Sequence, residues 1–210
     1  MQIGRKDWNF RRFFIAKSTQ ELKNKANNFI DNSFSDYCEN TTYTNVFLFS
    51  GLGTQKIKAG LELYKNEPVF KEEFEKCRII FNNYLEKDIK DIIFDDNNSQ
   101  LLNKPTYMQP AIFIIQYSMA KLWISKGIIP DILLGHSFGE YVAWAISEAI
   151  LLENIIKIVS IRGSLFEKVS GTMIAVSSKS NEIEKFLNEK IVIANYNAEE
   201  TKLIIGVSSD

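Results

Sequence analysis

ILLGHSFGEYVAW, residues 132–144, places a short apolar run, a serine between two glycines and a helix-forming segment in direct succession. The run indicates a strand, and a helix is expected from Glu140 onward. Gly135 and Gly139 flank Ser137 where the chain must turn tightly without Cβ clashes. The hydroxyl would then project near a helix N-terminus, whose N–H groups favour a developing anion. The stretch predicts a nucleophile elbow; the alternative is a plain glycine loop with the serine as helix N-cap.

A serine nucleophile needs a base, because an unaided hydroxyl attacks poorly. The chain has one histidine, His136, directly before Ser137. Neighbouring side chains on a tight turn usually diverge, so His136 is a poor geometric candidate for the base. A complete Ser-His-Asp triad therefore cannot be assembled from this chain.

Strands and helices alternate along the rest of the sequence. The run NVFLFS at 45–50 is apolar and precedes GLGT, which is typical of a buried parallel strand. An amphipathic helix closed by Gly127 is predicted at 107–126, with an apolar face made of Met108, Ile112, Ile115, Met119, Leu122 and Trp123. The other expected elements are a strand at 11–18, a helix at 19–34, a polar connector at 35–45, helices in pieces at 60–95, a loop at 94–105, helices at 140–152 and 154–170, and a β-α-β-β order over 171–210. This alternation predicts an α/β fold with a parallel sheet.

Composition narrows the class of protein. The chain has 210 residues, 45% of them hydrophobic, which suits one globular domain, or one and part of another. Its net charge of −1 gives no basic field for nucleic acid. Cys38 and Cys77 show no paired spacing, so we expect no disulfide scaffold or zinc site, and a reducing, cytoplasmic location. No apolar run approaches the about 20 residues that a membrane span needs. We therefore expect neither nucleic acid nor a membrane as partner.

Arg162 interrupts the apolar stripe of the helix predicted at 154–169. Helical spacing puts it where an apolar side chain is expected. An arginine placed towards a core needs an anion, and its planar fork suits a carboxylate. The alternatives are an arginine that snorkels to solvent or pairs with an internal glutamate.

Several ordered motifs resemble those of the malonyl-CoA:acyl carrier protein transacylase family, the acyltransferase domains of fatty acid and polyketide synthases. The matching stretches are FLFSGLGTQ (47–55), QPAIFIIQYSMAKLW (109–123), GHSFGEYVAW (135–144), GTMIAV (171–176) and NYNAEETKLIIGV (195–207). Arg162 also lies 25 residues after Ser137, where the family keeps its arginine. The resemblance covers essentially the whole chain.

The resemblance implies three segments. Residues 1–44 are similar to the linker between a ketosynthase and an acyltransferase. Residues 45–170 resemble the N-terminal part of an α/β-hydrolase-like, parallel-sheet large subdomain with a nucleophile elbow, and 171–210 the start of a ferredoxin-like small subdomain. The family's catalytic histidine, and its motif separating malonyl from methylmalonyl users, fall after residue 210. We therefore expect a C-terminally truncated domain that is inactive alone.

The activity implied by the resemblance is a ping-pong transfer. Ser137 would take a malonyl or related acyl group from coenzyme A and pass it to the phosphopantetheine thiol of an acyl carrier protein, with no bound cofactor and no metal. The backbone N–H groups of Gln55 and Phe138 would form the oxyanion hole. Arg162 would bind the free carboxylate of the acyl group. Without this context, GLGTQ reads as a plain strand-to-helix turn.

Other candidate residues have structural alternatives. Gln109 resembles a substrate-pocket residue but could equally be a capping amide before Pro110. His136 would line the acyl pocket or pack. Asn195 and Asn197 match family asparagines near the substrate, or mark a strand end.

Two other functions stay open. A serine esterase of the α/β-hydrolase type needs an acid and a histidine after the nucleophile. No histidine follows Ser137, and an esterase leaves Arg162 unexplained. A non-catalytic structural or docking remnant keeps the fold and is supported by the missing histidine. Acylation of Ser137 would separate the transferase from the remnant.

Overall fold

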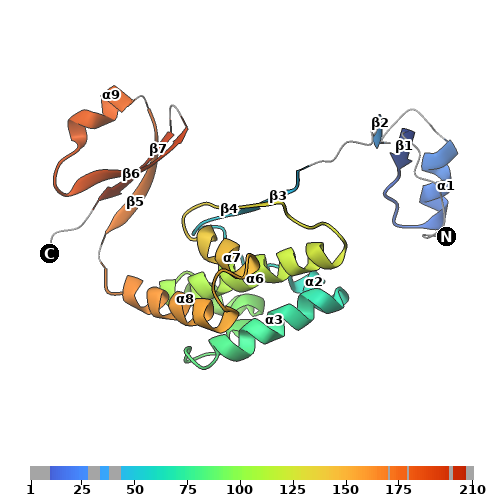
Figure 1. Cartoon of the computed structure of the whole chain (residues 1–210), viewed down its shortest axis with the longest axis horizontal. Coiled ribbons are helices and arrows are strands. Elements are labelled where there is room, and N and C mark those ends of the chain that lie inside the picture. Colours follow the sequence, from blue (N-terminus) through green and yellow to red (C-terminus); the bar gives the residue numbers. More distant parts are fainter. Residues whose placement is uncertain are drawn as a thin grey trace. The chain divides into compact units, whose positions relative to one another are not determined.

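The computed structural model describes residues 10–27, 34–37, 44–169, 171–178, 180–198 and 201–206 (Figure 1). The chain divides into two units, residues 1–44 and 45–210. The functional assignment of residues 1–44, and the further division at 170, stay predictions.

The first unit contains a small antiparallel sheet of two described strands. Strand β1 (Phe10–Phe13) pairs with β2 (Phe34–Tyr37), and α1 (Thr19–Asn27) comes between them in the sequence. The strand β2 corrects the prediction of a polar connector over 35–45. This segment pairs across the sheet with β1, a long-range interaction that its own polar composition does not reveal. Residues 28–33 of the predicted helix, and Cys38, lie outside the described residues.

The second unit begins with a parallel pair of strands. Strand β3 (Val46–Phe49) pairs in parallel with β4 (Ile132–Gly135), which confirms both predicted strands and the parallel sheet. Phe49 is buried in the core, but Val46 and Leu48 are 44% and 71% exposed. The prediction of a fully buried strand is therefore wrong for the described residues, in which this sheet has only these two strands.

Helices form most of the core of this unit. They are α2 (Leu61–Asn66), α3 (Pro68–Phe81), α4 (Ile89–Phe94), α5 (Ser99–Leu102), α6 (Pro105–Ser125), α7 (Gly139–Ile146) and α8 (Leu152–Phe166). The predicted loop at 94–105 contains a 3₁₀ turn (Asp96–Asn98) and α5, which corrects that prediction. The Asp95 carboxylate accepts from the N–H of Asn97, and Leu102 is buried, so a cap and a core contact stabilise helical turns that composition alone did not indicate.

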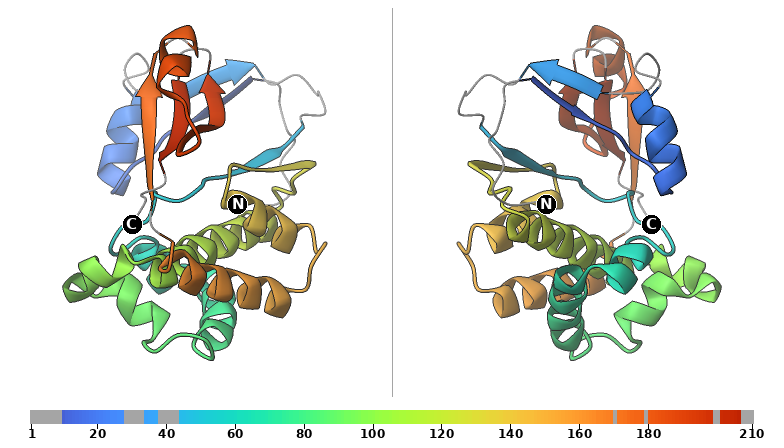
Figure 2. Two further views of the ribbon diagram at one scale, coloured as in Figure 1. Left: turned by 90° about the vertical axis from the view of Figure 1, so that its left-hand side faces the viewer. Right: turned by 90° about the vertical axis from the view of Figure 1, so that its right-hand side faces the viewer.

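Helix α6 is the central element of the core. It packs against α3, α7 and α8, and both views of Figure 2 show α3 and α8 below it. Gly127 follows it at φ 86°, which confirms the predicted glycine stop. The predicted amphipathic face is only partly right: Trp123 is 48% exposed, whereas Phe113 and Ile114 are fully buried. Flanking helices bury faces that the sequence pattern treated as outer ones.

The last three strands form a separate antiparallel sheet. It has the order β5-β7-β6, from β5 (Thr172–Ser177), β6 (Ile191–Ala198) and β7 (Thr201–Gly206). A short helix α9 (Ser180–Ile183) and a 3₁₀ turn (Glu184–Phe186) connect β5 to β6. The predicted β-α-β-β order is confirmed.

An ion pair stabilises the N-terminus of α4, and its contribution to the free energy of unfolding depends on pH. Arg78 donates from Nε to both carboxylate oxygens of Asp88, at 2.8 and 3.0 Å, and the same carboxylate caps α4 by accepting from the N–H of Lys90. The hydrogen bonds from Arg78 lower the pKa of Asp88 to about 2. Because the folded-state pKa is lowered, this stabilisation is present above about pH 4 and is lost as the pH falls through about 2.

We expect Asp88→Asn to lower the free energy of unfolding at neutral pH by about 1–2 kcal/mol, since the pair is partly screened by solvent. It should also flatten the decline of that free energy between about pH 4 and 2. Urea denaturation at several pH values measures both. Asp91→Asn, on the exposed surface of α4, is the matched control and should cost less than about 0.5 kcal/mol. Equal losses in the two variants would contradict the assignment.

Candidate active site

The turn between β4 and α7 is strained at Ser137. This residue is exposed and has φ 53°, in the left-handed region that non-glycine residues seldom adopt. The N-cap of α7 is Phe138, so Ser137 is not the helix cap, and the plain-loop alternative fails on this point. A Cβ on Gly135 would lie 2.2 Å from the backbone nitrogen of Glu140. The predicted strand–turn–helix geometry is therefore confirmed, and it needs glycine before the serine.

Gly139 allows the turn to approach β3. A Cβ there would lie 2.2 Å from the carbonyl oxygen of Phe49, which is backbone and cannot swing away. We expect Gly139→Ala to lower the free energy of unfolding by about 3 kcal/mol, near the upper end of typical overpacking costs. Thermal and urea denaturation measure it. Gly53→Ala is the control: a Cβ there meets nothing within 4 Å, so only its φ of 94° opposes the change, at about 1–2 kcal/mol. A smaller loss for Gly139→Ala than for Gly53→Ala would contradict this account.

The GLGTQ loop begins directly against the elbow. The N–H of His136 donates to the carbonyl of Phe49 at 2.9 Å, and a Cβ on Gly51 would lie 3.4 Å from the Cβ of Ser137. Gln116 fixes the preceding residue, because its Oε1 accepts from the N–H of Ser50 at 2.8 Å and its Nε2 donates to the Ser50 carbonyl at 3.1 Å. Sequence reasoning missed Gln116. The available signal was an amide inside the apolar run 111–117.

Gln55 is the last residue of the loop, and its side chain makes two hydrogen bonds. Its Oε1 accepts from the N–H of Gly53 at 3.1 Å, and its Nε2 donates to Oδ1 of Asn103 at 3.0 Å. These bonds fix the loop conformation around the Gln55 backbone. The described hydrogen bonds do not join Gln55 to Ser137, so the oxyanion-hole role of the Gln55 and Phe138 N–H groups stays a prediction.

Arg162 and Gln109 meet although 53 residues separate them. Arg162 donates from Nη1 to Oε1 of Gln109 at 2.7 Å. Gln109 lies inside α6 and is fully buried, so it is not a capping amide. Its Nε2 has no hydrogen-bond partner among the described residues. The amide therefore orients the guanidinium while one of its own donors is left unsatisfied.

Aromatic rings surround the same guanidinium. The Arg162 Cζ lies 4.1 Å from the ring centroid of Phe166, 5.5 Å from that of Tyr141 and 5.6 Å from that of Phe138, the residue after Ser137. Within the part of the chain that the structure describes, no carboxylate lies at ion-pair distance from Arg162, so the internal-glutamate alternative is not supported there. A half-buried cation held by an amide and rings beside the elbow is suited to an incoming anion.

His136 faces the small sheet. Its Nε2 lies 3.3 Å from Nδ2 of Asn195, on β6. Which of the two nitrogens donates in this contact depends on the tautomer of the imidazole. The structure thus brings two of the predicted pocket residues together. The side chain of Asn197 lies outside what the structure describes.

The described residues contain neither a cluster of metal-binding side chains nor a membrane-spanning helix. No group of three or more acidic, histidine or cysteine side chains is arranged to hold a metal ion. None of the helices is both long and apolar enough to cross a membrane.

These features define an α/β protein in which an exposed serine occupies a nucleophile-elbow turn between a parallel strand and a helix. Residues 46–210 match the sequence profile of the family described as acyl transferase domain, and the chain belongs to this family. It is 31% identical over 213 residues to probable polyketide synthase 22 of Dictyostelium discoideum, an alignment that covers 97% of the chain and 8% of that protein.

Solved structures agree with this assignment. The acyl transferase domain of ZmaA is 31% identical with a TM-score of 0.88, covering 98% of this chain and 50% of that one. The malonyl CoA-acyl carrier protein transacylase from Coxiella burnetii is 26% identical with a TM-score of 0.69, covering 80% of this chain and 56% of that one. The chain thus spans about half the length of these solved proteins and 4–10% of the first curated synthases it matches.

Proposed function

We propose that this chain is an acyltransferase that moves a malonyl-type acyl group from coenzyme A, through an ester on Ser137, to an acyl carrier protein of a polyketide or fatty acid synthase. One observation carries the proposal: an exposed serine at φ 53° lies one residue from Phe138, whose ring contacts a guanidinium without a carboxylate partner among the described residues. Family membership supports the reaction class, and the likeness to the Coxiella malonyl CoA-acyl carrier protein transacylase supports the donor and acceptor.

The transfer has two balanced steps. In the first, Oγ of Ser137 attacks the thioester carbonyl, the Oγ–C bond forms, the C–S bond breaks, and coenzyme A leaves as the thiol with the serine proton. In the second, the sulfur of the phosphopantetheine thiol attacks the ester carbonyl, a new C–S bond forms, the Oγ–C bond breaks, and the thiol proton passes to Oγ of Ser137. Negative charge on the carbonyl oxygen would be stabilised by the N–H groups of Phe138 and Gln55, each such donor contributing about 10²–10³ in rate.

Arg162 would select the acyl group by its charge. The planar guanidinium suits a terminal carboxylate, and Gln109 already holds one of its Nη atoms at 2.7 Å. Asn195 and His136 would line the same pocket from β6 and the elbow. Among the described residues, Cys77 is a buried free thiol. A reducing, cytoplasmic setting and a neighbouring ketosynthase domain are part of the proposal.

The experiment that tests this function combines donor and acceptor. The chain is incubated with malonyl-CoA, free coenzyme A thiol is measured, and a phosphopantetheinylated acyl carrier protein is then added. The proposal predicts thiol release matched by malonyl transfer to the carrier. Release that instead yields free malonate, with or without carrier, would indicate an esterase. No release by a chain that is folded by circular dichroism would favour the structural remnant.

Removal of the proton from Ser137 is the step expected to limit the rate of acyl loading by this chain alone. A positioned general base contributes about 10²–10⁴-fold, and His136, the single histidine, already faces Asn195 through Nε2. We therefore expect slow loading by the isolated chain and a rate increase of about tenfold on adding imidazole, since Ser137 is exposed to a small diffusing base. Intact-protein mass spectrometry over time measures the rate, with Ser137→Ala as the control. A rate independent of imidazole would contradict the missing-base account, and His136→Ala would then test whether the chain supplies its own base.

A further inference from the structure

The GLGTQ loop (51–55) is held by hydrogen bonds more than by packing. Gly53 and Thr54 are exposed, and a Cβ on Gly53 would meet nothing within 4 Å. A cavity of about 180 Å³ lies between this loop and α6, and Thr54 and Gln55 line it on the loop side. Because few neighbouring side chains press on the loop, its conformation depends on the polar contacts that join it to the helices.

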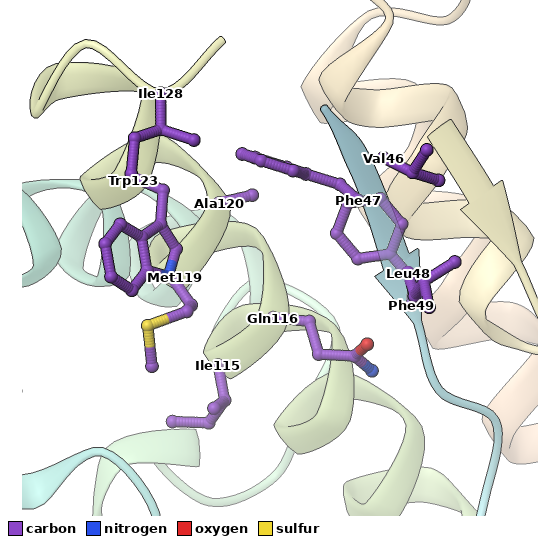
Figure 3. Close-up of a pocket in the computed structure, with 10 residues that line it drawn as sticks. All are labelled: Val46, Phe47, Leu48, Phe49, Ile115, Gln116, Met119, Ala120, Trp123 and Ile128. Carbon is purple, nitrogen blue, oxygen red and sulfur yellow. The ribbon is translucent and has the colours of Figure 1, made fainter. Parts of the chain in front are cut away.

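Hydrogen bonds attach the loop to the helices at both of its ends. At its start, Gln116 pairs with both backbone groups of Ser50, and Figure 3 shows the Gln116 side chain projecting from α6 toward β3. At its end, Gln55 donates from Nε2 to Oδ1 of Asn103 at 3.0 Å. Asn103 is the C-cap of α5 and lies two residues before the start of α6. The second attachment therefore links a predicted oxyanion-hole residue to the junction of two helices.

The side-chain amides of Asn103 and Gln55 form a relay whose direction is fixed at each end. Asn103 donates from Nδ2 to the carbonyl of Ser99 at 3.2 Å, and a carbonyl can only accept. Its Oδ1 therefore faces Gln55, which donates to it from Nε2. The remaining Oε1 of Gln55 accepts from the N–H of Gly53, which can only donate. One orientation of each amide satisfies both ends, so the relay fixes the Gln55 side chain on its own loop.

We infer that Asn103 is a positioning residue for acyl transfer, an inference that rests on the function proposed above. Through the side chain of Gln55, it holds the Gln55 backbone N–H in the orientation that stabilises the oxyanion formed at Ser137. Such a donor contributes about 10²–10³ in rate only when it is aimed at the developing charge, so a loop that turns away loses part of this factor. The hydrogen bond between the two side chains is exposed and adds little to stability. Loss of Asn103 should therefore lower the rate far more than the stability of the chain.

Two substitutions of Asn103 separate loop positioning from a local structural role. Asn103→Leu removes both bonds of the carboxamide. Asn103→Asp keeps the oxygen that accepts from Gln55 and loses the bond to Ser99, because a carboxylate cannot donate. A residue that positions the loop tolerates Asn103→Asp, whereas a residue that only caps α5 is impaired equally by both changes. Asn98→Leu is the matched control, since it removes a side-chain bond to the carbonyl of Asp91 in the same segment.

The first measurement is amide hydrogen exchange of the whole chain, which does not depend on activity. Asn103→Leu should speed exchange at the Gly53 amide about tenfold, whereas Asn103→Asp and Asn98→Leu should leave it within about threefold of the wild-type rate. The melting temperature of all three variants should stay within about 4 °C of the wild-type value. Unchanged Gly53 exchange in Asn103→Leu, or equal acceleration in both Asn103 variants, would overturn the relay.

The second measurement is the initial rate of Ser137 acylation by malonyl-CoA and by acetyl-CoA in the presence of imidazole. Asn103→Leu should lower the maximal rate about tenfold for both donors and leave the half-saturating donor concentrations within about twofold, because the oxyanion forms on a carbonyl that both donors share. Asn103→Asp should recover the rate to within about threefold. A fall confined to malonyl-CoA, or a normal rate despite fast Gly53 exchange, would overturn the positioning role. A wild-type chain that acquires no acyl group would contradict the proposed function, and Gly53 exchange would still decide whether Asn103 holds the loop.

Discussion

Ser137→Ala should abolish covalent loading, with residual acylation below about one part in 10³ of the wild-type chain. The reason is chemical: alanine has no oxygen with which to form the ester. The substitution removes one exposed atom, so stability should change by less than about 0.5 kcal/mol or rise slightly, because the turn is strained. Intact-protein mass spectrometry after incubation with malonyl-CoA measures the adduct.

Ser164→Ala is the matched control for this prediction. Ser164 is an exposed serine on α8 whose hydroxyl donates to the carbonyl of Ile161 within its own helix. Its loss should leave loading unchanged within about twofold. If Ser137→Ala still carried the adduct, or if both variants lost it equally, the nucleophile would be another residue.

Arg162→Ala should lower malonyl loading about 10²–10³-fold while leaving acetyl loading within a fewfold. A carboxylate that loses its partner in a half-buried site forfeits a charge-assisted bond and keeps its desolvation cost. An acetyl group lacks that carboxylate, so the rate of acetyl loading shows only whether the turn around Ser137 keeps its structure. The measurement is the ratio of initial loading rates with malonyl-CoA and acetyl-CoA.

Two further variants serve as controls for the ratio of malonyl to acetyl loading rates. Arg162→Lys keeps the charge without the planar fork and should recover only part of the malonyl rate. Lys157→Ala removes an exposed cation from the same helix and should leave the ratio unchanged. An equal fall in malonyl and acetyl loading for Arg162→Ala would assign the arginine to packing against Phe138 and Phe166 instead of substrate selection.

The elbow could be predicted from sequence because its constraints are local. Gly135 and Gly139 lie within two residues of Ser137, and a strand and helix flank them directly. The position of Arg162 inside an apolar stripe also predicted a half-buried cation. Its partners could not be derived in this way, because Gln109 is 53 residues distant and only the packing of α6 against α8 brings them together.

The errors have a common physical origin. The strand β2 is stabilised by pairing with β1, and α5 by a cap on the preceding turn and the burial of Leu102, so neither shows in local hydrophobic periodicity. The apolar face of α6 was predicted only from the helical spacing of its apolar residues. That spacing could not show which neighbouring helices cover each face. Gln116 was overlooked because its partners are backbone groups of Ser50, 66 residues earlier.

The most direct test of the central claim is to locate the acyl group. After incubation with malonyl-CoA and imidazole, trypsin should release the peptide 127–157, which contains Ser137 and Ser147. Fragmentation mass spectrometry of that peptide then assigns the modified residue. The account predicts malonyl on Ser137 and an unmodified Ser147. A folded chain whose Ser137 stays unmodified, or in which both serines are modified equally, would contradict it.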